Sequence, residues 1–406
     1  MNTAYPELQQ AFEKMILSAS GWRKVFAQSG NENDGIPAIS AADRDIVFLA
    51  AQSFVEFLHE EFPAIRTVIV ARDSRPTGAA LLKEAVTAFA TSAAAGSTAI
   101  TVQSAGITAA PEIMAYARTI GAAFMYISAS HNPIGHNGFK FGLDSGGVLD
   151  GNQSARLIAL FTQKCKAAHP DTVNLLRKDA DPAQLRTVFE SEAAHKQAAL
   201  TAYKNFLREV IADSQDTAEQ ARFFASLKQQ CAALAEAGKP FTLVADFNGS
   251  ARAASVDRTF FEQLDMQLTG IAEKAGTIVH GIIPEGNNLA TCAAKLEELH
   301  RSNPAQAENT LFGYMPDCDG DRGNIIYWDE AQQKALILEA QEVFALSVIA
   351  ELSHLRYSGK TDAPLAVTVN GPTSLRINEI ANALGAEVFY AEVGEANVVN
   401  RAEDAR

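Results

Sequence analysis

The stretch GAAFMYISASHNPIGHNGFK, residues 121–140, sets the arrangement that the rest of the chain follows. Its first part, 121–127, is a short apolar run containing Phe, Tyr and Ile, which predicts a buried strand. The serines that follow should then lie where the strand emerges into a loop, the position at which α/β proteins hold their chemistry. An Asn-Pro turn and an Asn-Gly turn fold this loop so that Ser130, His131 and Lys140 face one space.

This loop has the residue types of a nucleophilic site. A serine hydroxyl is a weak nucleophile that needs a neighbouring base, a positive field or a metal ion, and His131 and Lys140 can supply the first two. An Asx-rich surface loop with one histidine would have the same composition. The loop alone does not separate these interpretations, because short motifs recur by chance.

A second motif, DCDGDR at 317–322, follows another apolar run. Asp317, Asp319 and Asp321 alternate along it, and their oxygens are ligands suited to a hard divalent cation such as Mg²⁺. The mismatch with an EF-hand calcium loop argues against calcium of that kind, because such a loop needs glycine at position 6 and glutamate at position 12, where this chain has Arg and Trp. The alternative is a solvated acidic turn with Arg322 as its counter-ion.

The SASHNP serine, a lysine ten residues later and DCDGDR together resemble the α-D-phosphohexomutase family, the phosphoglucomutases and phosphomannomutases. The resemblance extends over nearly the whole chain. It implies that Ser130 carries a phosphoryl group. It also implies that Asp317, Asp319 and Asp321 bind Mg²⁺ together with that phosphoserine.

Further roles follow from the resemblance. The SGWRK sequence at 20–24 resembles an N-terminal element whose arginine reaches the phosphoserine, which gives Arg23 that role. Arg322 matches the arginine that closes the metal loop and is a substrate-binding candidate. A Val-Gly-Glu sequence ending at Glu395 resembles the third-domain motif that binds the sugar. The alternative is that Glu395 is a charged loop residue with no contact to the sugar. Cys318 stands where the family usually has glycine.

The predicted fold class is α/β, with consecutive mixed-sheet α/β domains of the phosphohexomutase type and a helical insertion. Strand and helix patterns alternate through three units, which supports this class. The expected domains are a phosphoserine domain at 1–165, a helical insertion or linker at 166–237, a metal-binding domain at 238–335 and an incomplete third domain at 336–406. Within them we expect helices at 6–17, 155–166, 192–211 and 218–237, strands at 98–102 and 277–283, and a structural charge network at 72–75.

Composition limits the partners. The chain of 406 residues is 47% hydrophobic and 20% charged, as soluble globular proteins are. Its net charge of -14 argues against nucleic acid and anionic membranes, so a phosphorylated substrate needs a local positive pocket. The four cysteines are scattered without a CxxC pair, and no signal peptide or long apolar run is visible, so we expect a cytoplasmic protein with free thiols.

The implied reaction interconverts hexose 1-phosphate and hexose 6-phosphate through the phosphoserine and a bisphosphorylated sugar. It depends on Mg²⁺ and on glucose 1,6-bisphosphate, or an equivalent hexose bisphosphate, as activator. His131 or Lys140 moves the proton of the sugar hydroxyl. The sequence ends before the family's sugar-reading loop and its C-terminal phosphate-binding domain. A catalytically weak sugar-phosphate-binding remnant and a Mg²⁺-dependent sugar phosphatase are therefore the alternatives.

Overall fold

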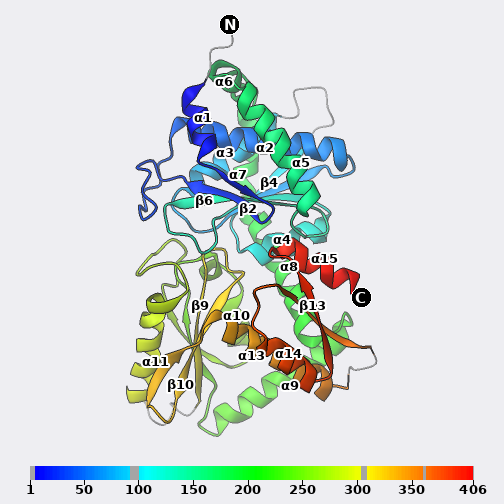
Figure 1. The fold of residues 1–406 in the computed structure, drawn as a ribbon. Coiled ribbons are helices and arrows are strands. Elements are labelled where there is room, and N and C mark those ends of the chain that lie inside the picture. The colour runs from blue at the N-terminus through cyan, green and yellow to red at the C-terminus, as the bar shows by residue number, and fades with distance from the viewer. Residues whose placement is uncertain (1–4, 92–99, 303–308, 360–362, 406) are drawn as a thin grey trace.

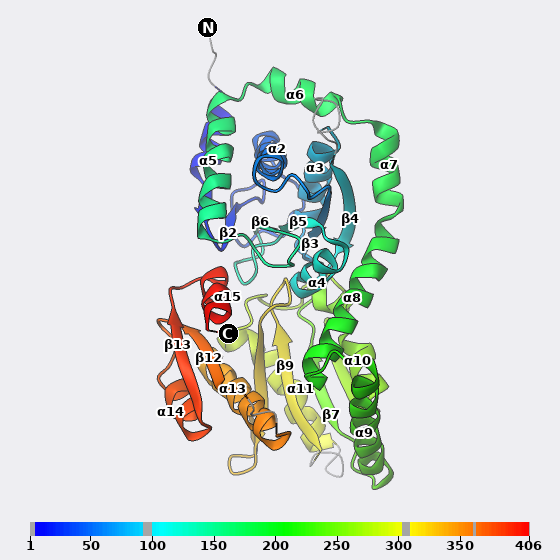
Figure 2. The ribbon, with the colours of Figure 1, turned by 90° about the vertical axis from the view of Figure 1, so that its right-hand side faces the viewer.

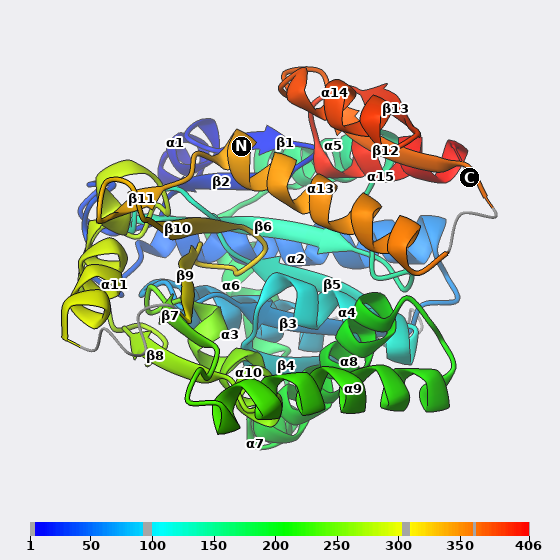
Figure 3. The ribbon, with the colours of Figure 1, turned by 90° about the horizontal axis from the view of Figure 1, so that it is seen from below.

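The computed structural model describes residues 5–91, 100–302, 309–359 and 363–405. Three α/β units make up the molecule (Figure 1), with the first unit above the other two and a long helical segment beside them. The view from below places the third unit and helix α9 on opposite sides of the molecule (Figure 3). None of the helices in the described ranges has the length and the apolar character that crossing a membrane requires.

The first unit is built on a six-stranded mixed sheet of order β1-β2-β6-β5-β3-β4. Strands β3, β4 and β5 are parallel, whereas β6, β2 and β1 continue the sheet antiparallel. The predicted buried strand is β5, which has no exposed residue. The elements are α1 (Pro6–Glu13), β1 (Ile16–Ser18), β2 (Gly21–Val25), α2 (Ala41–Glu61), β3 (Thr67–Arg72), α3 (Gly78–Thr91), β4 (Thr101–Ile107), α4 (Ala110–Ile120), β5 (Ala123–Ile127) and β6 (His136–Gly142).

Helices cover both faces of this sheet, which explains why its central strands are apolar throughout. On one face, Phe54 of α2 packs against Phe89 of α3 and Phe141 of β6, with ring centroids 6.4 and 4.9 Å apart. On the other face, Tyr116 of α4 belongs to a smaller cluster that also contains Ala199 of α8. Burial of one such aromatic side chain is worth about 1.5–3 kcal/mol, so the two layers fix the sheet between them.

The N-terminal prediction of a single helix at 6–17 is wrong at its end. Helix α1 stops at Glu13, and Ile16–Ser18 form the edge strand β1, which pairs with β2 in a tight hairpin. The hairpin hydrogen bonds replace a last helical turn. The predicted strand at 98–102 lies partly outside the described residues, and its described part belongs to β4.

The segment predicted as helical is helical, but it contains five helices where the sequence indicated three. The spacing of apolar residues did not reveal the two polar helices α6 and α7, because each has only nine residues. Aspartates cap the segment repeatedly: Asp150 forms a capping box, and Asp181 and Asp216 accept backbone N–H bonds. The helices are α5 (Gly151–Ala167), α6 (Pro170–Lys178), α7 (Pro182–Glu190), α8 (Glu192–Ala212) and α9 (Thr217–Glu236).

The second unit contains a five-stranded sheet of order β11-β10-β9-β7-β8. Its parallel strands β8, β7 and β9 are extended by the antiparallel hairpin of β10 and β11. The elements are β7 (Thr242–Asp246), η2 (Ala251–Ala254), α10 (Asp257–Gln263), β8 (Gln267–Ile271), η3 (Gly286–Leu289), α11 (Ala290–Ser302), β9 (Thr310–Pro316), β10 (Gly323–Asp329) and β11 (Lys334–Ile337).

The predicted strand at 277–283 is wrong, because this apolar run is a loop. The strand that pairs with β7 is instead β8, at 267–271, which precedes this segment in the chain. Asn248 holds the loop instead, by donating from Nδ2 to the carbonyl of Ile282 at 2.7 Å. Burial of Ile282 accounts for part of the apolar pattern.

The third unit is small and carries a two-stranded parallel sheet. Helices α13 and α14 pack on it through a cluster that includes Val348, Leu352 and Ile377. Helix α15 lies between this sheet and the first unit in Figure 2. The elements are α13 (Ala340–Tyr357), β12 (Leu365–Asn370), α14 (Arg376–Ala383), β13 (Ala386–Ala391) and α15 (Glu395–Asp404).

Candidate active site

Two loops from different sheets meet at the centre of the molecule. The loop after β5 carries Ser130, and the loop between β9 and β10 carries the three aspartates. The Ser130 hydroxyl donates to Oδ2 of Asp317 at 2.6 Å. A second bond joins the units through the backbone, because Ala110 N donates to the carbonyl of Asp319 at 2.8 Å. The two predicted motifs thus form one cluster.

A buried guanidinium holds the serine loop. Arg75 is fully buried and donates from Nη2 to the carbonyls of Ser130 and Asn132 at 2.6 and 2.5 Å. Its Nη1 donates to the carbonyls of Pro133 and His136 at 2.6 and 3.2 Å. The prediction that the charges of this turn are structural is confirmed for Arg75.

The backbone of Ser130 is itself unusual. Its φ is +49°, in the left-handed region that only glycine adopts at no cost. The Ser130 N–H donates to Oγ of Ser128 at 2.8 Å, which helps to fix this conformation. Residues held in such conformations cluster at functional sites, where surrounding contacts determine them.

Ser128 was not predicted as a site residue, but it lies within the cluster and contacts two of its carboxylates. Its Oγ lies 2.8 Å from Oδ2 of Asp73 and 3.2 Å from Oδ2 of Asp319. Burial raises the pKa of Asp73 despite the nearby charge of Arg75. The signal for Ser128 was available, since it lies two residues before Ser130 in the same loop.

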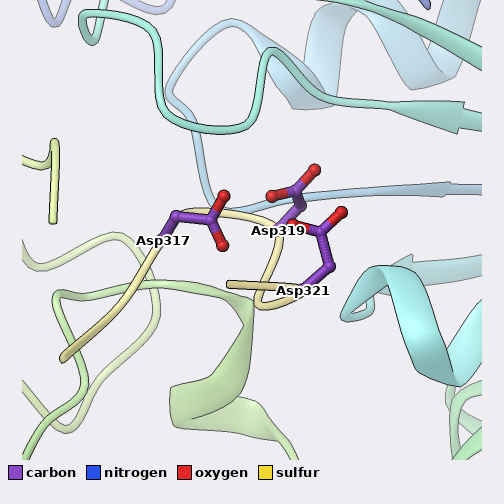
Figure 4. A group of neighbouring side chains, drawn as sticks. All are labelled: Asp317, Asp319 and Asp321. Atoms are coloured by element: carbon purple, nitrogen blue, oxygen red, sulfur yellow. The ribbon is translucent and has the colours of Figure 1, made fainter. Parts of the chain in front are cut away.

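The three aspartates gather their oxygens in one place (Figure 4), with one ligand atom from each lying within 4.8 Å of the others. The backbone N–H groups of Gly320 and Arg322 donate to Oδ1 of Asp317 at 3.1 and 3.2 Å and shape the loop around that carboxylate. Burial and the charges of the other two aspartates raise the pKa of Asp317. Burial opposes ionisation of Asp319 as well, but Lys140 holds the pKa of that carboxyl below its usual value.

The ammonium of Lys140 bridges two of these carboxylates. Its Nζ lies 3.0 Å from Oδ2 of Asp319 and 2.9 Å from Oδ2 of Asp321. Burial alone would lower the pKa of Lys140, but these two carboxylates raise it. The aspartate cluster therefore stabilises a positive charge placed between its carboxylates.

The cluster fits a divalent cation. Oδ1 of Asp319 is buried and has no hydrogen-bond partner among the described residues, and an oxygen left in that state costs free energy. Three carboxylates so close together are also the hard oxygen donors that Mg²⁺ prefers. Asp317, Asp319, Asp321 and the Ser130 oxygen are the atoms that would hold such an ion.

A cleft of about 790 Å³ opens over the cluster. Every predicted catalytic and substrate-binding side chain lines it, as does one of the three predicted metal-binding aspartates, and they come from all three units. Trp22, Phe344, Asn370, Gly394 and Val398 also line it, and sequence reasoning did not select them. The predicted lining residues are Arg23, Ser130, His131, Lys140, Asp321, Arg322 and Glu395.

Two arginines, Arg23 and Arg322, line the cleft in a protein of net charge -14. Arg23 lines it and has no hydrogen-bond or ion-pair partner among the described residues. The Arg322 guanidinium is 56% exposed, and its Nε is 3.9 Å from Oδ1 of Asp321, so most of its donors face solvent. Guanidinium groups of this kind bind phosphate oxygens in bidentate fashion.

Two titratable side chains face the cleft in an atypical state. His131 has a buried Nδ1 without a partner among the described residues, and burial followed by the charge of Arg322 lowers its pKa. Glu395 begins α15, and burial raises its pKa although the charge of Lys140 opposes this. Imidazole and carboxyl groups are both suited to exchanging hydrogen bonds with sugar hydroxyls.

Known proteins resemble this chain in the sequence of its first unit and in its fold. Residues 16–167 match the family model described as phosphoglucomutase/phosphomannomutase, alpha/beta/alpha domain I. No curated protein sequence matches the chain.

Solved structures share the fold over nearly the whole chain. A protein of Thermus thermophilus assigned as a phosphomannomutase is 18% identical with a TM-score of 0.59, covering 94% of this chain and 70% of that one. A phosphoglucomutase/phosphomannomutase family protein of Burkholderia thailandensis is 16% identical with a TM-score of 0.56, covering 96% and 69%. The phosphoglucomutase parafusin of Paramecium is 15% identical with a TM-score of 0.58, covering 93% and 62%.

The chain thus spans roughly two thirds of the length of these neighbours. At such identities the structural likeness establishes the fold, and the sequence match establishes the family of the first unit. The predicted resemblance is thus confirmed for the family of the first unit and for the fold of the chain. Within a phosphohexomutase-type fold, this chain carries domain I of the phosphoglucomutase/phosphomannomutase family.

Proposed function

We propose that this chain is a phosphohexomutase, which transfers a phosphoryl group between Ser130 and the hydroxyls of a hexose phosphate. The observation that carries the proposal is the 2.6 Å bond from the Ser130 hydroxyl to Asp317, made beside a cleft whose lining includes Arg23 and Arg322. A nucleophile, an acidic cluster and cationic side chains are the parts that phosphoryl transfer requires.

Each side chain has a task in this scheme. Phosphorylated Ser130 gives its phosphoryl group to a free sugar hydroxyl, so that the sugar O–P bond forms as the Ser130 Oγ–P bond breaks. Arg23 and Arg322 bind phosphate oxygens across the cleft. After the resulting bisphosphate reverses its orientation, the other phosphoryl group returns to Ser130. The net reaction interconverts hexose 1-phosphate and hexose 6-phosphate, with glucose 1,6-bisphosphate or an equivalent as activator.

Asp317, Asp319 and Asp321 would hold Mg²⁺ together with the Ser130 phosphate. A bound Mg²⁺ supplies positive charge to the oxygens of the transferring group. Lys140 donates to Asp319 and Asp321 in the present arrangement and would be free to turn towards the sugar when that charge is supplied otherwise.

His131 and Lys140 are the candidates for accepting the proton of the attacking hydroxyl. Both line the cleft, but they differ in what they offer. Lys140 is a donor held charged by two carboxylates, whereas His131 has an unpartnered ring nitrogen. A pH–rate profile of His131→Asn separates them, because loss of the acidic limb of the wild-type profile would assign the base to His131.

The sequence-based boundaries remain part of this proposal: a phosphoserine domain at 1–165, a helical linker at 166–237, a metal-binding domain at 238–335 and a third domain from 336. Glu395 is proposed to contact the sugar. The cysteines are free thiols and buried, which supports a reducing, cytoplasmic location.

The first test is the intact mass of the purified chain after incubation with glucose 1,6-bisphosphate and Mg²⁺, followed by peptide mapping. A gain of one phosphoryl group at Ser130, absent in Ser130→Ala and retained in the exposed-loop control Ser145→Ala, supports the proposal. No phosphorylation would overturn it.

Coupled product assays then separate the outcomes. Isomerised sugar phosphate means a mutase, free phosphate means a sugar phosphatase, and binding without turnover means a sugar-phosphate-binding protein. The last two would each restrict the function of this chain.

A further inference from the structure

Helix α8 connects the first unit to the second (Figure 2), running from beside β4 and α4 towards α9 and α10. Glu192 accepts a hydrogen bond from Ser104 of β4 at 2.5 Å, and Lys196 forms an ion pair with the buried Glu112 of α4. Eleven residues after Glu192, Tyr203 reaches the second unit. Spacings of four and seven residues place these three side chains on one face of the helix.

The partner of Tyr203 in the second unit is Arg252. Its Nη1 donates to the tyrosine hydroxyl at 2.7 Å, while Nε and Nη2 donate to Oδ1 of Asp257 at 3.1 and 2.6 Å. The guanidinium also lies over the Tyr203 ring, 5.5 Å from its centroid. These contacts fix the orientation of Arg252, whose side chain is only 16% exposed.

The stem of Arg252 lies directly against the aspartate loop. A methyl group added at Gly320 would approach Cγ and Cδ of Arg252 to 2.5 Å, so nothing larger than a hydrogen fits between them. The φ of Gly320 is +73°, a conformation that favours glycine. The neighbouring Ala251 N donates to the carbonyl of Cys318 at 3.0 Å. The Arg252 segment therefore forms one wall of the loop.

The start of helix α4 forms a second wall. Its first residue, Ala110, donates its N–H to the carbonyl of Asp319, and Cβ of the preceding Ala109 lies 3.4 Å from the added methyl position. Helix α4 also carries Glu112, the partner of Lys196. Both walls of the aspartate loop are thus anchored to the same helix, α8.

We propose that α8 is a brace for the aspartate loop and that Tyr203 is a positioning residue, acting through Arg252 on the carboxylates that bind the metal ion. This inference rests on the proposed Mg²⁺ site. It assigns a task to the helical segment, which supplies no side chain to the cleft. Without the tyrosine hydroxyl, Arg252 keeps Asp257 but loses the contact that holds its stem over Gly320.

The experiment measures divalent-metal affinity directly, by titrating Mn²⁺ into the apo full chain with electron paramagnetic resonance detection. Tyr203→Phe should weaken Mn²⁺ binding roughly tenfold, the low end of the effect seen when outer contacts of a metal site are removed. The matched control is Tyr357→Phe, since Tyr357 is 93% exposed. Thermal unfolding of the apo variants shows whether the fold is retained.

A second variant keeps the proposal falsifiable if Tyr203→Phe unfolds. Arg252→Lys retains the charge beside Asp257 but lacks the fork that reaches Tyr203, and it should weaken Mn²⁺ binding to a similar extent. Affinities of either folded variant within twofold of wild type would overturn the proposal, as would a wild-type chain that binds no Mn²⁺.

Phosphorylation of Ser130 is scored separately, and this keeps the two proposals distinguishable. If Tyr203→Phe weakens Mn²⁺ binding but the wild-type chain is never phosphorylated, the brace proposal is supported and the mutase proposal is refuted. If the wild-type chain is phosphorylated but Tyr203→Phe binds Mn²⁺ as tightly as wild type, only the brace proposal is refuted.

Discussion

The ammonium of Lys140 lies 3.0 Å from Oδ2 of Asp319, where it neutralises carboxylates that would otherwise repel one another. The aspartate is fully buried, and the lysine side chain is 16% exposed. Lys140 therefore offsets part of the repulsion among these carboxylates.

Lys140→Met should destabilise the apo protein by about 3 kcal/mol, because removing one partner of a buried ion pair leaves the other charge uncompensated. Mg²⁺ should then stabilise the variant more than it stabilises wild type, since the ion replaces the lost charge. Urea unfolding with and without Mg²⁺ measures both effects. The control, Lys295→Met, removes an exposed pair with Glu298 and should change stability by less than about 1 kcal/mol. Equal Mg²⁺ effects in both variants would contradict the expectation.

Asp317→Asn should abolish metal binding while leaving the apo protein as stable as wild type or more so. The pKa of Asp317 is raised by burial and by the neighbouring carboxylates, which means that its charge opposes folding at neutral pH. The asparagine removes that charge and keeps an oxygen for the N–H groups of Gly320 and Arg322. Thermal unfolding of the apo form, with Mn²⁺ titration alongside, checks this. A large loss of apo stability would show that the charge is needed for folding.

Arg75→Lys should destabilise the protein by about 3 kcal/mol or more, since an ammonium cannot replace the guanidinium contacts to four carbonyls and Asp73. Phosphorylation of Ser130 should slow as well, because the loop loses its support. Denaturant unfolding and the rate of phosphoryl uptake are the measurements. The exposed Arg118→Lys is the control, and a variant matching it in stability would refute a structural role for Arg75.

His280 should make stability depend on pH. Its Nε2 is 2.8 Å from Oδ2 of Asp246, and this hydrogen bond raises the pKa of the imidazole despite partial burial. A histidine with a raised folded-state pKa contributes stability that is complete below its unfolded pKa of about 6.5 and is lost as pH rises through the folded value.

The free-energy difference between wild type and His280→Gln should therefore be larger at pH 6 than at pH 9. Asp246→Asn should remove the same dependence, which identifies the pair as its source. The comparison uses urea unfolding at each pH, and a difference that grows with pH would disprove the assignment.

Much of the candidate site could be predicted because its residues follow strands. Ser130 and Asp317 both come directly after apolar runs, and strand ends are where α/β proteins place polar side chains. The alternating aspartates of DCDGDR, in turn, are typical of a loop that binds a divalent cation. These local signals identified both loops, but they could not show that a serine and an aspartate separated by 187 positions share a hydrogen bond.

The parts that could not be predicted depend on tertiary contacts. Residues 277–283 have the apolar pattern of a strand, but they form a loop that Asn248 holds through the carbonyl of Ile282. Tyr203 lies in a polar helix whose periodicity gives no hint of Arg252, and Ser128 gains its meaning only from Asp73 and Asp319. In each case the deciding partner is remote in sequence.

The bracing by α8 has a consequence for motion. Because this helix contacts both the first and the second unit, we expect those two units to move as one body and the third unit to rotate against them. Only Leu338 and Glu339 separate β11 from α13, so this pair is where a hinge would bend. Since α15 carries Glu395 into the cleft, a rotation there would open and close the entrance for sugar phosphates while the aspartate loop stayed still.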